Sequence, residues 1–210
     1  MIRSTFCLAL CAAAAAAAFS THNLLDYGAD ASGATDASPA LRAALAAIAA
    51  DGGGTLLLPR GTYSLKPFNL TSNSALVLDD ATIVASDAPG DFALVPALPS
   101  YGEGRDKLPN DRSGRYQPFI GIYYASNVSI TTSSAGYIHG SGAAWWQAKD
   151  KGTLNNTPPH LIEAGWSRDL AFGAPAGSPL NALSFINSPF WNLHIYDCDN
   201  SYGKEERNTY

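Results

Sequence analysis

The chain has 210 residues, of which 46% are hydrophobic, and it carries a formal net charge of −5 at pH 7. This acidic balance argues against nucleic acid and anionic membrane surfaces as partners, because both repel a negatively charged protein. It does not exclude an acidic polysaccharide, since a few local basic groups can bind one on an acidic protein. The length suits a single domain with a hydrophobic core of its own.

The first twenty residues have the pattern of a secretory signal peptide. Arg3 precedes a short apolar run, and Ala18 and Ser20 have the small side chains that a signal peptidase accepts. We therefore expect residues 1–20 to be removed and residues 21–210 to be secreted, to the extracellular space or the cell wall. No later segment approaches the roughly 20 apolar residues that a membrane span needs. Without Arg3 the exported chain has 12 basic and 18 acidic residues, a net charge of −6.

Cysteines and sequons add two expectations for an exported chain. Removal of the signal peptide takes Cys7 and Cys11 and leaves Cys198 alone, so no internal disulfide is expected. Three asparagines begin N-x-S/T sequons and are candidate glycosylation sites: Asn69, Asn127 and Asn155.

The stretch from residue 35 to residue 63 predicts a short helix that leads into a strand. We expect the hydroxyl of Ser38 to cap the helix, and Pro39 suits its first turn, where no N–H is needed. Apolar residues then recur at helical spacing, at Leu41, Leu45 and Ile48. The glycine run 52–54 ends the helix. Because short strands follow, we expect the apolar face of this helix to cover the open end of a stack of strands.

Short apolar runs bounded by turn-forming residues follow, and they predict β-strands. The runs are 55–58, 63–65, 75–78 and 82–86. Asp79 and Asp80 lie between two of them and are predicted to form a turn. Residues 87–116 break the pattern with four prolines and four glycines. A segment of this length without periodicity is either a functional loop or a surface insertion.

Three later segments, 119–130, 161–172 and 183–195, share the order strand, polar turn, strand. Asn127 and Asp169 are 42 residues apart, which we interpret as two turns of about 21, and Asp169 and Asn192 are 23 apart. A repeat in the twenties predicts an all-β parallel β-helix, in which each coil needs neighbours to bury its inner face. A β-sandwich also contains many short strands, but the Asn-Gly and Asp-Gly hairpin turns that it favours do not occur between residues 119 and 195.

Several motifs between residues 25 and 198 occur in a specific order and spacing. They are YGAD at 27–30, GGGTLLLPRGTY at 52–63, SYGEGRD at 100–106, the pair Trp145–Trp146, PHLIE at 159–163 and NSPFWNLH at 187–194. In these motifs the chain resembles the polygalacturonases and related family 28 glycoside hydrolases, most of all the plant-type subgroup. The glycine-rich segment alone is shared with pectate lyase-like β-helices, whereas the later motifs are specific to this family.

The resemblance implies a right-handed parallel β-helix and a hydrolase that cleaves galacturonan with inversion. Such chemistry needs one carboxylic acid to protonate the glycosidic oxygen and a carboxylate across the sugar to activate water. In the family these acids lie in N-T-D and D-D segments, followed by G-H-G and R-x-K motifs, all after NSPFW. None of the four follows NSPFW here. We therefore expect no catalytic residue and no cofactor or metal in this chain, and we interpret residues 21–210 as the N-terminal part of one β-helix domain, truncated and inactive as it stands.

Four residues are candidates for substrate binding. His194 and Trp191 lie in a stretch that the family places near its cleft, so they either contact a sugar ring or serve the core and a strand corner. Arg105 and Arg115 either pair with the carboxylate of a uronate or are solvated loop charges. The partner that the resemblance implies is a pectic or related acidic polysaccharide.

Two alternative functions share the fold. A secreted, non-catalytic β-helix that binds cell-wall glycan would explain the missing acids. A pectate lyase-type enzyme would use Ca²⁺ and a basic residue, but the sequence shows no acidic cluster spaced to hold calcium.

Overall fold

The computed structural model describes residues 19–96, 98, 114–173 and 182–203 of the chain. The helices in these ranges are α1 (Ser38–Ala50) and α2 (Ala143–Asp150), with two short 3₁₀ turns, η1 (Leu24–Tyr27) and η2 (Pro89–Asp91). The strands are β1 (Ser20–Asn23), β2 (Ser32–Asp36), β3 (Gly54–Leu58), β4 (Gly61–Leu65), β5 (Phe68–Leu70), β6 (Ser74–Leu78), β7 (Ala81–Ala85), β8 (Leu94–Val95), β9 (Arg115–Tyr116), β10 (Ile120–Tyr123), β11 (Ser126–Thr132), β12 (Ala135–His139), β13 (Ile162–Gly165), β14 (Arg168–Phe172), β15 (Ala182–Ile186), β16 (Leu193–Tyr196) and β17 (Asp199–Gly203). No helix in the described ranges is long and apolar enough to cross a membrane.

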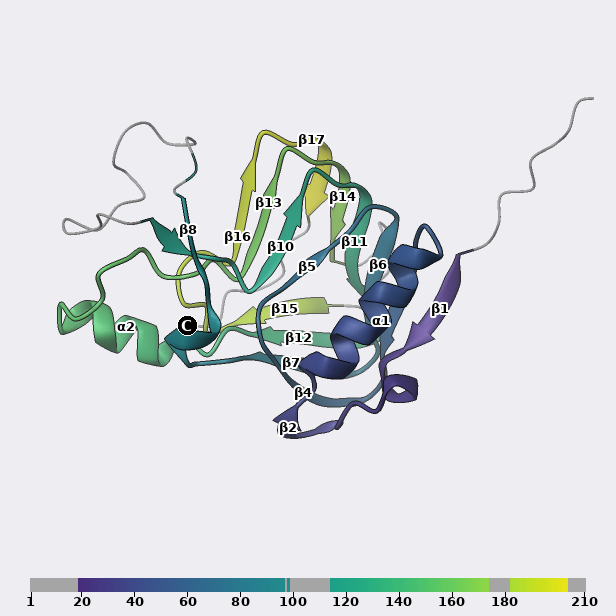
Figure 1. The fold of residues 1–210 in the computed structure, drawn as a ribbon, viewed down its shortest axis with the longest axis horizontal. Helices are drawn as coiled ribbons and strands as arrows, with labels where there is room; N and C mark the ends of the chain where they lie inside the picture. The colour runs from purple at the N-terminus through teal and green to yellow at the C-terminus, as the bar shows by residue number, and fades with distance from the viewer. Residues whose placement is uncertain (1–18, 97, 99–113, 174–181, 204–210) are drawn as a thin grey trace, which may run out of the picture.

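Three parallel sheets form the body of the protein. We call them sheet A (β1-β3-β6-β11-β14-β17), sheet B (β15-β12-β7-β4-β2) and sheet C (β16-β13-β10-β5). From β3 onward the chain visits A, B and C in turn and returns to A one layer further on (Figure 1). The fold is therefore a right-handed parallel β-helix, as predicted. Because β8 and β9 are the single antiparallel pair among the described strands, the β-sandwich alternative is wrong.

The predicted repeat length was wrong, although the repeated strands are present. In sheet A, Ser126 pairs with Arg168, so the stretch between Asn127 and Asp169 makes one coil and not two. The preceding coil is longer still, because Thr132 pairs with Leu78, 54 residues earlier in the chain. The coils differ in length because insertions loop out between strands, which leaves the strand registers intact.

The inner faces of the strands build the hydrophobic core. In sheet A, Leu56 pairs with Leu76, Leu76 with Ile130, and Ile130 with Phe172, and all four side chains are buried. Successive side chains of a strand point to opposite faces, so every second residue joins such a row. Each coil thus covers the apolar row of the next, which is the physical reason that short strands suffice here.

Helix α1 covers the end of the stack where the described chain begins, as predicted (Figure 1). Leu41, Ala44 and Ile48 are buried against the first coil. The predicted cap was wrong: the residue before the helix is Ala37, which has no capping side chain, and the backbone N–H of Ser38 instead donates to the Asp36 carboxylate at 2.9 Å. The Ser38 hydroxyl accepts a hydrogen bond from the backbone N–H of Lys66 at 2.8 Å, which ties the helix to the strand end of sheet B.

Helix α2 was not predicted, because its short sequence carries a weak apolar stripe. Trp145 is buried, and its ring packs edge-on against Phe92 at 5.3 Å and Tyr116 at 4.8 Å between ring centres. Trp146 lies on the exposed side, with the Lys149 ammonium 4.6 Å from its ring centre. The helix therefore packs against both described ends of the segment 87–116, through Phe92 and Tyr116.

Polar corners join the sheets, and the prediction for Asp79 and Asp80 is confirmed. Both residues lie between β6 and β7, and Asp80 adopts a left-handed backbone with φ +54°. Asp79 accepts a 2.6 Å hydrogen bond from the hydroxyl of Ser133 in the next coil. Asp80 forms an exposed ion pair with Arg60. These aspartates therefore stabilise the corner between sheets A and B.

Candidate functional site

The outer face of sheet C carries the strongest concentration of polar chemistry. Ile162 pairs with Ile120 and Leu193, and both isoleucines point into the core. Because side chains alternate along a strand, the next residues, Glu163 and His194, point outward in one row. Loops from neighbouring coils cover this row, so Glu163 is 0% exposed and His194 only 1%.

Glu163 is the centre of a buried hydrogen-bonded cluster, which we call the Glu163 cluster: Arg115, Tyr123, His160, Glu163 and His194. Its Oε1 accepts from Arg115 Nη2 at 2.6 Å and from the Tyr123 hydroxyl. Its Oε2 accepts from the Nδ1 atoms of His160 at 2.7 Å and His194 at 3.0 Å. A carboxylate with four donors is fully satisfied, and the Arg115 guanidinium balances its charge.

The protonation states follow from this arrangement. Burial by itself would raise the pKa of Glu163, but hydrogen bonds from both histidines and the Arg115 charge hold that pKa well below its ordinary value of 4.5. Burial and the neighbouring carboxylate raise the pKa of the Tyr123 hydroxyl above 10.0. Burial lowers the pKa of His160 below 6.5, against the pull of Glu163. Near neutral pH the cluster therefore holds an ionised Glu163, a protonated Tyr123 and a neutral His160.

Three residues of the cluster form the one group in the described chain whose possible ligand atoms are close enough to suggest a metal site. His160, Glu163 and His194 place their ligand atoms within 4.8 Å of one another. However, both Nδ1 atoms approach the same carboxylate oxygen at hydrogen-bond distance, and the adjacent Arg115 already neutralises the carboxylate. The geometry fits a shared set of N–H donors better than a set of metal ligands, which must all give up their protons.

An aromatic group lies directly beside the cluster and reaches solvent. The rings of Phe190 and Trp191 are nearly parallel, 8° apart, with centres 5.3 Å apart. His160 packs against both, and its ring centre lies 4.4 Å from that of His194. Trp191 is 40% exposed. Four of the five cluster residues are buried and Tyr123 is partly exposed, while Trp191 presents its ring at the surface.

The four residues predicted to bind substrate have different positions. His194 and Arg115 belong to the buried cluster, so neither presents a free charge to a ligand, and Arg115 is not a solvated loop charge either. Trp191 lies at the surface next to the cluster. Arg105 lies outside the described residues.

The sequence reasoning missed Glu163, His160 and Tyr123 as site residues. A signal for Glu163 was present: in LIEAG the apolar Ile162 and Ala164 flank it, so strand alternation places the carboxylate on the outer face. No local signal connects Tyr123 or Arg115 with Glu163, because they lie 40 and 48 residues away in sequence.

The described part of sheet C does not assemble the acid pair of an inverting glycosidase. Glu163 is the one carboxylate on the described strands β5, β10, β13 and β16. An inverting enzyme needs two carboxyl groups roughly 6.5–9.5 Å apart, one of them protonated. Glu163 is ionised and engaged with four donors, so its role is to hold neighbouring strands and loops together.

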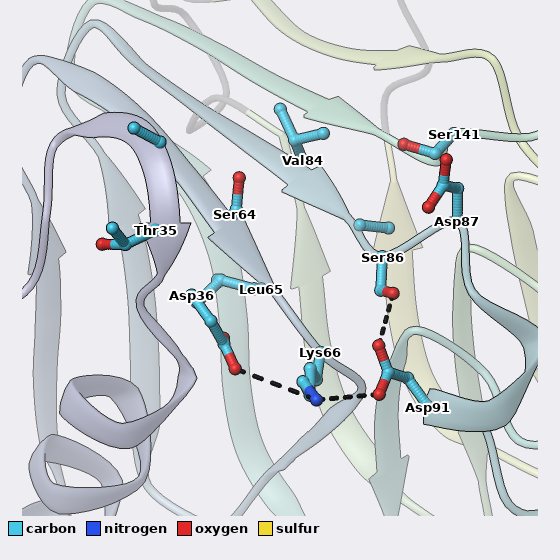
Figure 2. Close-up of a pocket in the computed structure, with 12 residues that line it drawn as sticks. Thr35, Asp36, Ser64, Leu65, Lys66, Val84, Ser86, Asp87, Asp91 and Ser141 are labelled. Carbon is cyan, nitrogen blue, oxygen red and sulfur yellow. Dashed lines mark hydrogen bonds and ion pairs between the residues drawn. The ribbon is translucent and has the colours of Figure 1, made fainter.

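A groove lies on the outer face of sheet B (Figure 2). This open groove has a volume of about 350 Å³, and its residues include Asp36, Lys66 and Asp91. Lys66 Nζ lies 2.8 Å from one oxygen of Asp91 and 4.0 Å from Asp36, and the other Asp91 oxygen accepts from the Ser86 hydroxyl at 2.6 Å. Lys66 is the single cation of this lining and faces Asp36 and Asp91, and the exposed Asp87 also lines the groove, so the groove is net negative and does not suit an acidic ligand.

The candidate glycosylation sites are all accessible in the described structure. Asn69 is exposed on β5, and Asn155 is exposed in the loop after α2. Asn127 is also exposed, but its Nδ2 donates a hydrogen bond to Asn73 Oδ1 at 3.1 Å. A glycan on Asn127 would have to replace that bond. The predicted signal peptide lies outside the described residues up to residue 18, while Ser20 begins β1 and pairs with Gly54.

Comparison with known proteins gives consistent similarities. The chain is 34% identical over 178 residues to a probable polygalacturonase of Vitis vinifera, covering 82% of this chain and 33% of that protein. A polygalacturonase from Erwinia carotovora ssp. carotovora superposes with a TM-score of 0.60 at 25% identity, covering 88% of this chain and 46% of that one. A hyperthermoactive exopolygalacturonase from Thermotoga maritima gives a TM-score of 0.65 at 22% identity, covering 87% and 45%, and supports the fold. No protein-family model matches the sequence.

These relatives are longer than the chain. It spans about a third of the Vitis vinifera protein and just under half of the two bacterial structures. A shorter match, 41% identical over 72 residues, is to a mannuronan C5-epimerase of Azotobacter vinelandii and covers 34% of this chain.

Proposed function

We propose that this chain, which is polygalacturonase-like in sequence and in fold, forms part of a secreted glycoside hydrolase that cleaves pectic polysaccharide. The relatives named as polygalacturonases support the reaction class and the substrate class. The outer face of sheet C, with the exposed Trp191 at its edge, is the surface that we assign to the polysaccharide. Secretion rests on the signal-peptide pattern of residues 1–20.

The observation that carries the proposal is the row of outward residues on sheet C. The register of sheet C aligns Asn69, Gly121, Glu163 and His194 at one point of the strand, and Glu163 and His194 place outward side chains there in two successive coils. A rigid, charge-balanced cluster under the surface fixes the strands on which an extended chain of sugars would lie. A polysaccharide-binding surface requires such preorganisation, because flexible strands would not hold the scissile bond in one orientation.

Trp191 and the cluster have separate roles in this proposal. Trp191 binds a sugar ring through its exposed face, since the apolar C–H face of a pyranose packs well on an aromatic ring. Arg115, His160 and His194 are positioning residues, which act through Glu163 and do not touch the substrate. The two reacting carboxylates are not among the described residues of sheet C.

The proposal is tested by measuring the reducing ends released from polygalacturonate by the full-length secreted product, with a neutral xylan as the control substrate. We expect release from polygalacturonate alone. The variant Trp191→Ala should raise KM at least fivefold with little change in kcat or melting temperature. Trp146→Ala is the matched control, because Trp146 is similarly exposed, at 36%, but lies on α2.

Two results would contradict the proposal. One is the absence of any release from pectic substrates by a folded, secreted full-length product. The other is an equal rise in KM for Trp191→Ala and Trp146→Ala, which would show that the surface beside the Glu163 cluster has no special contact with the substrate.

A further inference from the structure

Three aromatic side chains gather at the corner where the chain passes from sheet C to sheet A, and we call them the aromatic corner: Tyr124, Trp166 and Tyr196. The rings of Tyr124 and Trp166 are almost parallel, 4° apart, with centres 5.1 Å apart. Tyr196 meets the Trp166 ring edge-on, at 87° and 5.3 Å. Trp166 is therefore covered on both sides, whereas Tyr124 stands at the end of the stack and is 75% exposed.

The backbone at this corner is unfavourable for aromatic residues. Tyr124 and Trp166 occupy equivalent positions in successive coils, with φ +51° and +50°, and each backbone N–H continues the ladder to the next coil. The left-handed region suits glycine, asparagine or aspartate, and Asp197 fills the same position one coil later with φ +49°. A bulky aromatic residue at a strained and exposed position gains little from burial, and such outliers point to function.

The free face of Tyr124 is a consequence of coil length. Ile122 pairs with Leu70 and Val128 with Ser74, so residues 123–127 stand opposite only residues 71–73 of the preceding coil. That shorter corner carries small polar side chains, and among the described residues no ring lies against Tyr124 on this side. The structure thus leaves a flat aromatic surface open, supported from behind by Trp166.

We propose that the aromatic corner binds a pyranose ring of a uronic acid-containing polysaccharide, outside the surface described above for Trp191. The choice of ligand rests on the proposed function, while the site itself rests on the geometry of the corner. The open face of Tyr124 stacks on the C–H face of the sugar. Arg168, which begins β14 two residues after Trp166, supplies a cation for the uronate carboxylate. Its 70% exposed side chain has its Nε 4.0 Å from the Asp169 carboxylate, an exposed and therefore weak pair with which the uronate would compete.

The corner also lies next to the proposed cleft. Tyr124 directly follows Tyr123, whose hydroxyl bonds Glu163, and Trp166 directly follows Gly165, against which the Tyr123 ring packs. A polysaccharide held at the corner would therefore stay close to sheet C. We expect the corner to add to the retention of long chains and to leave short substrates unaffected.

The test uses the full chain in affinity electrophoresis through gels that contain polygalacturonate, together with thermal unfolding. Tyr124→Asn removes the ring but suits the left-handed backbone, so the melting temperature should stay within about 2 °C of the wild type or rise. The apparent Kd for polygalacturonate should rise at least fivefold. Tyr137→Asn is the matched control, because Tyr137 is an exposed tyrosine on β12, in sheet B, and its loss should leave binding unchanged.

Three outcomes would overturn the proposal. Tyr124→Asn could bind as well as the wild type, or it could melt far below the wild type, which would make Tyr124 a structural residue. Alternatively, the wild type could fail to bind polygalacturonate and instead self-associate through Tyr124 in sedimentation. The last result would assign the corner to a second copy of the chain.

Failure of this proposal is distinguishable from failure of the proposed function. Hydrolysis of trigalacturonate by the full-length product reports the proposed function and should be the same for wild type and Tyr124→Asn. Binding without hydrolysis would support the corner and contradict the hydrolase. Hydrolysis with unaltered binding in Tyr124→Asn would support the hydrolase and contradict the corner.

Discussion

Glu163→Gln is the substitution that most directly tests the Glu163 cluster, because it removes one charge and preserves the shape of the side chain. Glu163 is fully buried, and Arg115, its counter-ion 2.6 Å away, is only 3% exposed. The amide would leave Arg115 as an uncompensated buried cation, which costs about 3–5 kcal/mol. For a domain of this size, roughly 2–4 °C is lost per kcal/mol, so we expect the melting temperature to fall by roughly 6–20 °C.

The assay is thermal and urea unfolding of the wild type and variants at pH 7. A matched control is Asp80→Asn, which removes the carboxylate of the ion pair with Arg60. That pair is exposed at the surface, with Arg60 84% exposed, and asparagine tolerates the left-handed backbone at this position. Exposed pairs contribute about 0–1 kcal/mol, so Asp80→Asn should melt close to the wild type.

A double variant separates charge balance from other effects of Glu163→Gln. Replacing both members of a buried ion pair costs much less than removing one. We therefore expect Arg115→Met combined with Glu163→Gln to lose clearly less stability than the sum of the two single variants. An additive double variant, or a Glu163→Gln protein that melts as the wild type does, would refute the conclusion that charge balance stabilises the cluster.

Three further perturbations follow from the structure. First, folding lowers the pKa of His160, so the unfolded state binds more protons than the folded state below the ordinary pKa of 6.5. The free energy of unfolding should therefore fall as the pH drops from 7 to 5. In urea unfolding, His160→Gln should reduce the slope of this free energy against pH by up to about 1.4 kcal/mol per pH unit. Second, a Cβ at Gly142 would lie 2.5 Å from the Ser188 carbonyl carbon, so Gly142→Ala should lower the melting temperature by several degrees, whereas Gly90→Ala, with open space around it, should not. Third, Ile48→Ala should lower the free energy of unfolding by about 2–5 kcal/mol in urea, because this fully buried side chain of α1 covers the first coil. A loss under about 1 kcal/mol would contradict the conclusion that α1 covers the core at this end of the β-helix.

Local patterns in the sequence were sufficient for several strands and for helix α1, which covers the first coil. Short apolar runs bounded by turn-forming residues identified β3, β6 and β7, and helical spacing of Leu41 and Ile48 identified the buried face of α1. These features depend on residues within one or two turns of each other, so the sequence alone determines them. The motifs shared with polygalacturonases indicated the fold class, because each motif is a continuous segment that can be recognised without the structure.

Only the tertiary structure decided which residues meet. Arg115, Tyr123 and His194 lie 48, 40 and 31 residues from Glu163, and they converge because the coils stack in register. The coil lengths are also unequal, since a short coil joins β3 to β6 and a much longer one joins β6 to β11. The insertions that lengthen a coil have no sequence periodicity, so the sequence alone does not predict the coil lengths. Burial of Arg115 follows from the same convergence, because a guanidinium leaves water only where a carboxylate is already placed to receive it. The aromatic corner also required the structure, since the open face of Tyr124 exists only because the neighbouring coil is shorter at that point.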